Sequence, residues 1–259
     1  MSCRRAIALG SGMAALALVG CGRVGFEGLA DAGGAPKPGP GPDPVPDAPV
    51  SRIAYVGPFV QRSPPGTGPN ESFTAQAHAA GNAVVIQVSC AANAVPTAVS
   101  VVAPGWSFSQ LGPITASASS QQRSATFVAI APDAIGVTVT VSWSGSTCNG
   151  SKNDVGDEFA MTDPAGGTIT FDGVAATEGT GNCTGTVKTG HAGDAVWAAC
   201  NSDDSVTAVG AGFRKGADDH VGDWSEYAIT DHPAGTVESV EFANPNVGYV
   251  LSMVTLKAR

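Results

Sequence analysis

The most regular alternation of apolar and polar residues in the chain lies between Gly136 and Ser144. In this stretch, GVTVTVSWS, every second residue is a valine or a tryptophan, and hydroxyl side chains lie between them. Because successive side chains of a strand point to opposite faces, the pattern predicts a half-buried strand with Trp143 on its buried face. Runs of similar character predict further strands at 82–91, 97–103, 124–131, 194–201, 205–214, 224–230, 236–243 and 248–257.

The segments between these runs are rich in turn-forming residues. The chain has 34 Gly and 18 Pro, and after Arg52 no segment repeats its apolar residues with the period of a helix. Short strands separated by Gly, Pro, Asn and Asp are typical of antiparallel sandwiches, whereas parallel sheets need helical crossovers. We therefore expect an all-β fold. The 259 residues, 43% of them hydrophobic, are enough for one or two packed domains.

Four short sequence matches relate the two halves of this region, and they occur in the same order in both. In the first match AGNAV is answered by AGDAV, so that Asn82 corresponds to Asp194. Ordered matches predict two tandem antiparallel β-sandwich modules, at 52–164 and 165–259. The alternative is one larger sandwich whose Gly- and Val-rich strands merely look alike. The matched segments are 80–84 with 192–196, 104–108 with 209–213, 124–127 with 224–227, and 136–139 with 235–238.

This ordered pattern resembles the small jelly-roll or immunoglobulin-like modules of bacterial surface and secreted proteins. The resemblance covers about residues 70–259 and is generic. It implies the sandwich architecture and transfers no active site, because modules of this kind have diverse roles.

The N-terminus has the pattern of a secretion signal. Residues 1–21 read MSCRRAIALGSGMAALALVGC, with two arginines before an apolar run. The run is shorter than the roughly 20 apolar residues of a membrane span and is interrupted by Gly. Its last residues, LVGC at 18–21, resemble the lipobox of bacterial lipoproteins. The resemblance implies a signal peptide of residues 1–20 and a lipid-bearing Cys21; the alternative is an ordinary signal peptide cleaved elsewhere.

Several acyl chains on one cysteine would anchor the mature chain to a membrane without spanning it. Gly22 follows the cysteine, where retention in the inner membrane usually requires Asp. The resemblance therefore implies an outer-membrane lipoprotein that faces the periplasm or the cell surface. Residues 21–51, with PKPGPGPDPVPDAP at 36–49, predict a disordered Gly- and Pro-rich linker between the lipid and the folded part.

The cysteines beyond the signal and the lipid anchor are even in number, in a compartment that favours disulfides. Four cysteines allow three connectivities. If each module holds one pair, Cys90 bonds to Cys148 and Cys183 to Cys200. The alternative is a four-thiolate zinc site, but the close CxxC pairs that such a site uses are missing.

The charge of the chain is strongly negative and lies mainly in its second half. Removal of residues 1–20 takes away two arginines and no acid, which changes the formal net charge from -9 to -11. A chain this acidic excludes nucleic acid as an expected partner. Residues 151–259 hold 16 acidic and six basic residues. The simplest explanation of this acidic half is a solvated surface that keeps the protein soluble.

The densest acidic segment is DDHVGDWSE at 218–226. Carboxylates on a loop with a permissive glycine can supply the oxygen ligands of calcium, so we consider a Ca²⁺ site at Asp218, Asp219 and Asp223. The spacing does not match an EF-hand loop. Apart from this ion we expect no cofactor.

No segment has a catalytic motif such as G-x-S-x-G or H-E-x-x-H. The four histidines, at 78, 191, 220 and 232, have contexts typical of surface loops, so we expect no catalytic residue. We expect Trp143 and Trp197 in the core. Trp224 lies among acidic residues and is a candidate contact for a carbohydrate or a protein ligand; the alternative is that it fills the edge of the sandwich.

The sequence thus predicts an outer-membrane-anchored lipoprotein whose β-sandwich part is a non-catalytic binding, adhesion or envelope-structural module. Its expected partners are the membrane, through the lipid, and a carbohydrate or protein ligand. The competing class is an extracytoplasmic hydrolase with an unrecognised site, which would need a cleft that gathers a histidine, a carboxylate and a nucleophile.

Overall fold

The computed structural model of the protein describes residues 52–62, 68–145, 148, 150–163 and 166–259. They belong to one compact unit, Pro46–Arg259. The predicted signal peptide at 1–20, the lipid-bearing Cys21 and the linker at 21–51 lie outside the described residues. The described part is built of antiparallel strands, which confirms the all-β prediction. None of its segments is a helix of the length and apolar character that crossing a membrane requires.

Strands from residues 52–164, hereafter the first half, form two sheets. The larger has the strand order β1-β8-β3-β6-β5 and the smaller the order β2-β7-β4. Their bounds are β1 (Ile53–Arg62), β2 (Asn70–Gln76), β3 (Ala83–Ala91), β4 (Ala98–Val102), β5 (Ser109–Ala116), β6 (Gln122–Ile130), β7 (Gly136–Ser144) and β8 (Lys152–Met161).

Strands from residues 165–259, the second half, also form a large and a small sheet. The larger has the order β12-β13-β11-β15-β9, and the smaller pairs β10 with β14. Their bounds are β9 (Ile169–Thr180), β10 (Cys183–Lys188), β11 (Ala195–Ser202), β12 (Arg214–Asp218), β13 (Trp224–Ile229), β14 (Val237–Phe242) and β15 (Gly248–Ala258).

The second half repeats the strand order of the first. Read from β9, its large sheet runs β9-β15-β11-β13-β12, which matches β1-β8-β3-β6-β5 strand for strand. An isolated bridge between Ala208 and Ala243 takes the place of the pairing of β4 with β7. The four sequence matches fall on corresponding elements: β3 and β11, the segments before β5 and β12, β6 and β13, and β7 and β14. The division into modules at 52–164 and 165–259 stays a prediction, and this repetition supports it.

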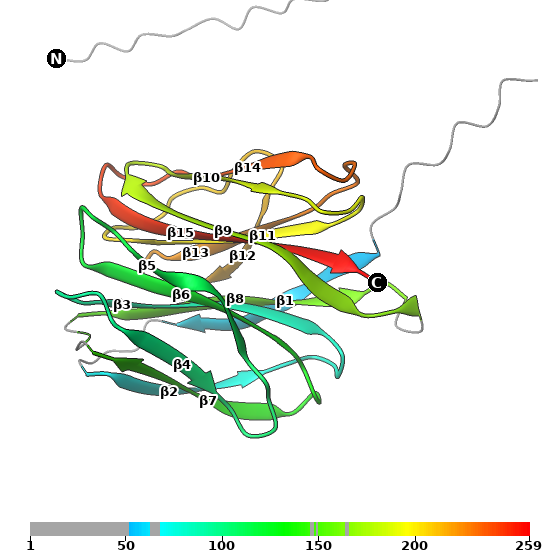
Figure 1. Cartoon of the computed structure of the whole chain (residues 1–259), viewed down its shortest axis with the longest axis horizontal. Helices are drawn as coiled ribbons and strands as arrows, with labels where there is room; N and C mark the ends of the chain where they lie inside the picture. Colours follow the sequence, from blue (N-terminus) through cyan, green and yellow to red (C-terminus); the bar gives the residue numbers. More distant parts are fainter. Residues whose placement is uncertain (1–51, 63–67, 146–147, 149, 164–165) are drawn as a thin grey trace, which may run out of the picture. The chain divides into compact units, whose positions relative to one another are not determined.

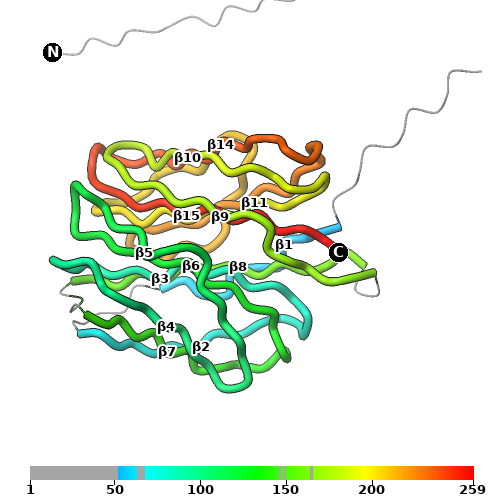
Figure 2. Tube along the Cα trace, in the orientation of Figure 1, coloured from blue at the N-terminus to red at the C-terminus, as the bar shows by residue number. Residues whose placement is uncertain are grey.

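The sheets of residues 52–259 stack as four layers, with the two large sheets face to face in the middle and a small sheet on each outer side (Figure 1). Figure 2 shows the same layers along the Cα trace. Three apolar clusters lie between the layers. The middle cluster draws on both halves, with Val85 and Phe159 from one large sheet and Trp197 and Leu256 from the other.

The burial of each strand follows its layer. β7, in an outer sheet, alternates between exposed and buried residues as its sequence predicts, and Trp143 lies in the core. The strands β3, β8 and β11 are buried along nearly their whole length because other layers cover both of their faces. Trp197, on β11, is fully buried, as expected.

One predicted strand is wrong. The run at 205–214 contains no strand apart from the isolated bridge at Ala208, and β12 begins only at Arg214. Gly212 has a φ of 85°, a left-handed conformation that interrupts an extended chain. The backbone of this segment bonds to other elements through single contacts, such as Val206 N to Gly222 O at 2.8 Å.

Two disulfides link the layers. Cys90 of β3 bonds to Cys148, with Cα atoms 5.5 Å apart, and Cys183 of β10 bonds to Cys200 of β11, with Cα atoms 6.2 Å apart. These are the pairs favoured on the assumption of one bridge per module. Each bridge holds a central strand of a large sheet to a segment outside that sheet.

Candidate functional site

The interface between the two large sheets, hereafter the seam, is polar toward one end. Nε2 of Gln87 donates to Oγ of Ser252 at 2.9 Å, and Nδ2 of Asn201 donates to Oγ of Ser89 at 2.8 Å. Both bonds cross from one half to the other between buried residues. Because a buried amide that lacks a partner is costly, these pairs fix how the sheets are aligned.

A cleft of about 660 Å³ opens at this end of the seam. Both halves line it, and one wall is tied to the other by Gln122, whose Nε2 donates to Oδ1 of Asp203 at 2.9 Å. We call it the seam cleft. Its lining residues are Ala91, Ser120, Gln121, Gln122, Gly150, Ser151 and Asn153 from the first half, and Ser202, Asp203, Asp204, Val221 and Asp223 from the second.

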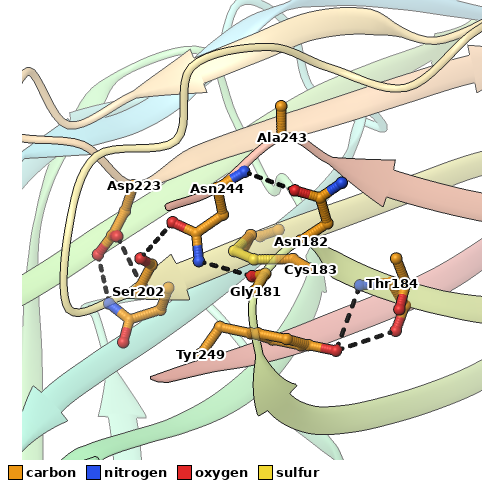
Figure 3. The surroundings of a disulfide bond; sticks show 12 residues. Gly181, Asn182, Cys183, Thr184, Ser202, Asp223, Ala243, Asn244 and Tyr249 are labelled. Atoms are coloured by element: carbon orange, nitrogen blue, oxygen red, sulfur yellow. Dashed lines mark hydrogen bonds between the residues drawn. A yellow bond between two sulfur atoms is a disulfide. The ribbon is translucent and has the colours of Figure 1, made fainter. Parts of the chain in front are cut away.

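Asp223 is the buried acid of the seam cleft, with only 2% of its surface exposed. Its Oδ1 accepts the backbone N–H of Ser202 at 3.0 Å, and its Oδ2 accepts Nδ2 of Asn153 at 2.6 Å and Nδ2 of Asn201. Figure 3 shows this carboxylate beside Ser202, near the disulfide at Cys183. Burial, and second the charge of Asp219, raise the pKa of Asp223. The acid therefore joins the two halves at the floor of the cleft.

The loop at 218–223 forms one side of the cleft, and Asp219 organises it. Oδ1 of Asp219 accepts the backbone N–H groups of Val221, Gly222 and Asp223, each at 2.9 Å. His220 has a φ of 68°, in the left-handed region that non-glycine residues rarely adopt. The loop thus turns tightly around a buried carboxylate, which pushes Val221 outward so that 58% of it is exposed.

A second concavity of about 340 Å³ lies on the other side of the loop. Its lining includes Asp218 and Trp224, and Val221 lines both concavities. Trp224 is partly buried against the core of the second half, and Nζ of Lys215 lies 3.2 Å from the centroid of its ring. Trp224 therefore faces a concavity with one part of its indole while a cation–π contact covers another part.

The three candidate calcium ligands face different surroundings. Asp218 pairs with Nζ of Lys215 at 2.6 Å, Asp219 holds the loop backbone, and Asp223 lies in the seam. Among the described residues these acids do not form a group of donor atoms within 4.8 Å of one another. Calcium binding at these residues stays a prediction.

The seam cleft is suited to hydrogen bonding. Nine of its twelve lining residues carry a hydroxyl, amide or carboxyl group, and no lysine, arginine, histidine or aromatic residue is among those described. Asp203 and Asp204 are exposed at its rim. The negative rim disfavours anionic ligands, whereas hydroxyl-rich or cationic ligands find acceptors and donors at short range.

Three of the four histidines lie away from the seam cleft, each beside an acid, whereas His220 is on the loop at 218–223 and lines the second concavity. Nδ1 of His78 is 2.6 Å from Glu158, and Nδ1 of His232 is 2.5 Å from Glu238. Hydrogen bonding by Glu238 raises the pKa of His232. A third pair, His191 with Asp172, has a further acid beside it and is the one arrangement of the described residues that could hold a metal ion.

Sequence reasoning placed Trp224 and the acids at 218–223 near a site but missed the residues that complete the cleft. Gln122, Asn153 and Asp203 come from three separate segments, and only the stacking of the sheets brings them together.

Comparison of the chain with known protein families, with curated proteins and with solved structures finds no match.

Proposed function

We propose that this protein is a lipid-anchored outer-membrane protein that binds a hydroxyl-rich ligand, a carbohydrate of the cell envelope or its surroundings, in the seam cleft. It acts without catalysis. The observation that carries this proposal is the lining of the cleft, in which nine of twelve residues offer hydroxyl, amide or carboxyl groups at the junction of the two halves.

A sugar presents donors and acceptors in close pairs, and amide and carboxyl side chains match that pattern. Gln121 and Asp204 are exposed at the cleft and come from opposite walls, so a ligand between them is held from both sides. Val221 supplies an apolar patch between the two concavities, and Trp224 in the neighbouring one offers an aromatic surface to a longer ligand.

The proposed anchor and linker place this cleft away from the membrane. A Pro-rich linker extends by about 3.1 Å per residue, so the linker at 21–51 would hold the binding part several nanometres from the lipid. A binding protein on such a tether can reach polysaccharide that is not at the membrane surface.

The test is binding of polysaccharide by the purified, detergent-solubilised full chain, on a glycan array and by co-sedimentation with insoluble polysaccharides, including peptidoglycan sacculi. The variants Gln121→Ala and Asp204→Ala should reduce binding by about tenfold, because each removes hydrogen bonds to the ligand. Trp224→Ala should reduce binding of long glycans more than of short ones.

Ser239→Ala is the matched control. Ser239 lines a different concavity, on the small sheet of the second half, and its loss should leave binding unchanged. Binding that is insensitive to both Gln121→Ala and Asp204→Ala would contradict the assignment to the seam cleft. Absence of binding to every glycan would overturn the ligand class.

A further inference from the structure

A cluster of metal-ligating side chains lies at the end of β11 opposite to the seam cleft. Asp172 belongs to β9, and His191 and Asp194 lie in the turn between β10 and β11. One donor atom of each, two carboxylate oxygens and an imidazole nitrogen, lies within 4.8 Å of the other two. In the part of the chain that the structure describes, this is the one such group of three.

Asp172 is aimed by a bulge in β9. In the pairing of β9 with β15, Gly173 lies opposite Thr255 and Phe171 lies opposite Leu256, so Asp172 has no residue opposite it. A bulge of this kind redirects a side chain, and bulges are common beside functional sites. The carboxylate lies against Gly190, where any β-carbon would collide with its Oδ2.

Asp194 forms the buried floor of the cluster. Only 1% of its surface is exposed, and its Oδ2 accepts the backbone N–H groups of Gly190 and His191, both at 2.9 Å. Its Oδ1 is buried and has no hydrogen-bond partner. A buried carboxylate oxygen without a donor is costly, so this atom points to a ligand that the protein itself does not supply.

The first half contains the corresponding turn, and its backbone is arranged alike. Asn82 and Asp194 are equivalent in the sequence match, and each follows a glycine with positive φ, 85° at Gly81 and 79° at Gly193. The carbonyl of Asn82 accepts the backbone N–H of Ala131, the residue after β6. In the same way, the carbonyl of Asp194 accepts the backbone N–H of Thr230, the residue after β13.

The side chains around the two turns differ. In the first half, Nδ1 of His78 is 2.6 Å from Oε2 of Glu158, and Nδ2 of Asn82 donates to Oε1 of Glu158 at 2.5 Å. Histidine, carboxylate and amide thus satisfy one another. In the second half Asp194 itself accepts the backbone N–H groups of the turn, as Glu158 accepts those of His78 and Ala79 in the first half. The Oδ1 of Asp194, unlike the Oε1 of Glu158, receives no amide donor, and a bound cation would balance the charge of the two carboxylates.

Lys257 supplies part of the positive charge at this cluster. Its Nζ lies 3.4 Å from Oδ1 of Asp172 and 3.2 Å from Nε2 of His191. It does not supply a donor to the buried Oδ1 of Asp194. Two carboxylates and one ammonium leave one negative charge in the cluster, so Lys257 is a competitor of a metal ion and does not replace it.

We propose that Asp172, His191 and Asp194 bind zinc. Zinc takes histidine nitrogen and carboxylate oxygen at about 2.0–2.2 Å in a tetrahedral arrangement, which sets the ligand atoms roughly 3.4 Å apart. The three donor atoms already lie within 4.8 Å of one another, so rotation of the exposed Asp172 and His191 side chains would have to shorten this spacing by little more than 1 Å. Calcium fits less well, because it takes six to eight oxygen ligands and avoids imidazole. Water fills the fourth zinc position.

The test is calorimetric titration of ZnCl₂ into the full chain, purified without a histidine tag and stripped with chelator. One zinc should bind per chain. Asp194→Asn and His191→Ala should each weaken binding at least about tenfold, since each removes a ligand. Asp194→Asn keeps a side-chain oxygen that can accept the backbone N–H groups of Gly190 and His191, so the turn should be retained. Lys257→Met should tighten binding about two- to fivefold, the effect of one partly exposed ion pair.

His232→Ala is the matched control, because His232 pairs with Glu238 at a similar exposure but is not in the three-donor group. It should leave zinc binding unchanged. The proposal is overturned if the wild-type chain binds no zinc, or if Asp194→Asn and His191→Ala bind it as tightly as the wild type. The glycan-binding variants Gln121→Ala and Asp204→Ala should retain zinc binding, so the two proposals fail or stand separately.

Discussion

The indole Nε1–H of Trp197, on β11, donates a 2.7 Å hydrogen bond to Oδ2 of Asp157, on β8. Asp157 is fully buried between the two large sheets and also accepts the hydroxyl of Tyr55, at 3.0 Å, and that of Ser225. Donors from both halves therefore converge on a single carboxylate of the first half. This arrangement fixes the relative position of the two sheets more specifically than apolar contact alone.

Asp157 gives the protein a pH-dependent stability. Burial raises its pKa from 3.8 to about 6, against the opposing effect of its hydrogen bonds. The folded state therefore holds the proton more tightly than the unfolded state, and the stability from this group is present below pH 4 and is lost as the pH rises toward 6. At about 1.4 kcal/mol per pKa unit the loss is roughly 3 kcal/mol.

Asp157→Asn should remove this dependence. Urea unfolding at a series of pH values from 4 to 7 measures it: the wild type should lose stability between pH 4 and 6, and the variant should have a flatter profile there. Glu226→Gln is a useful comparison, because burial raises the pKa of Glu226 to about 7 and places its loss of stability at higher pH. An unchanged slope below pH 6 in Asp157→Asn would contradict the role of this carboxyl group.

Gly156→Ala should destabilise the fold by about 1–3 kcal/mol, the usual cost of overpacking a core. Gly156 lies opposite Ile86 in the pairing of β8 with β3. A β-carbon there would collide with the Ile86 side chain and lie 2.7 Å from the carbonyl oxygen of Val85. Thermal and urea unfolding measure the effect.

Gly136→Ala is the matched control for that substitution. At Gly136 the nearest atoms to an added β-carbon, on Ala75 and Thr74, are 3.9 Å away. The variant should equal the wild type or gain up to about 1 kcal/mol, because alanine lowers the entropy of the unfolded chain. Equal destabilisation by both substitutions would show that contact with β3 is not the cause.

The two disulfides should contribute unequally to stability. The bridge from Cys90 to Cys148 closes a separation of 58 residues, and that from Cys183 to Cys200 closes 17. In the chain-entropy description their removal should cost about 4 and about 3 kcal/mol, respectively. Urea unfolding of the two paired Cys→Ala variants measures the difference; a larger loss for the shorter loop would contradict this order.

Cys21→Ser should release the protein from the membrane, if Cys21 carries the proposed lipid. The variant should incorporate no labelled palmitate and should appear in the soluble fraction, since the acyl chains supply the anchoring free energy. Cys3→Ser is the control, because Cys3 would be removed with the signal peptide and its replacement should change neither labelling nor fractionation. A Cys21→Ser variant that remains labelled would refute the anchor.

The sequence predicted strands of both the middle and the outer layers, and the strands that it missed lie in both as well: no predicted run covers β1, β2, β5, β8, β9 or β10. β7 has one face on the core, and its valines and hydroxyl residues alternate accordingly. β8 was not predicted, because its sequence KNDVGDEFAM places Asp154, Asp157 and Glu158 at buried positions. A pattern rule treats charged residues as exposed, whereas here Trp197 and Ser225 donate to Asp157, and Asn82 and the backbone of His78 donate to Glu158, which permits their burial.

The candidate sites were likewise only partly predictable from the sequence. The acidic loop at 218–223 is visible as a local cluster of charge, but the backbone that Asp219 holds and the amides that surround Asp223 are not. The proposed zinc cluster left a signal in the sequence, the replacement of Asn82 by Asp194 between matched segments. Its meaning depends on Asp172, which only the bulge in β9 brings to the turn.

The middle apolar cluster, drawn from both large sheets, makes each half depend on the other. A chain that ended after the first half would turn Val85 and Phe159 toward water, and a chain that began at the second would do the same with Trp197 and Leu256. An apolar sheet face of that kind promotes self-association. Neither half is therefore a portable part that could be transplanted alone into another protein.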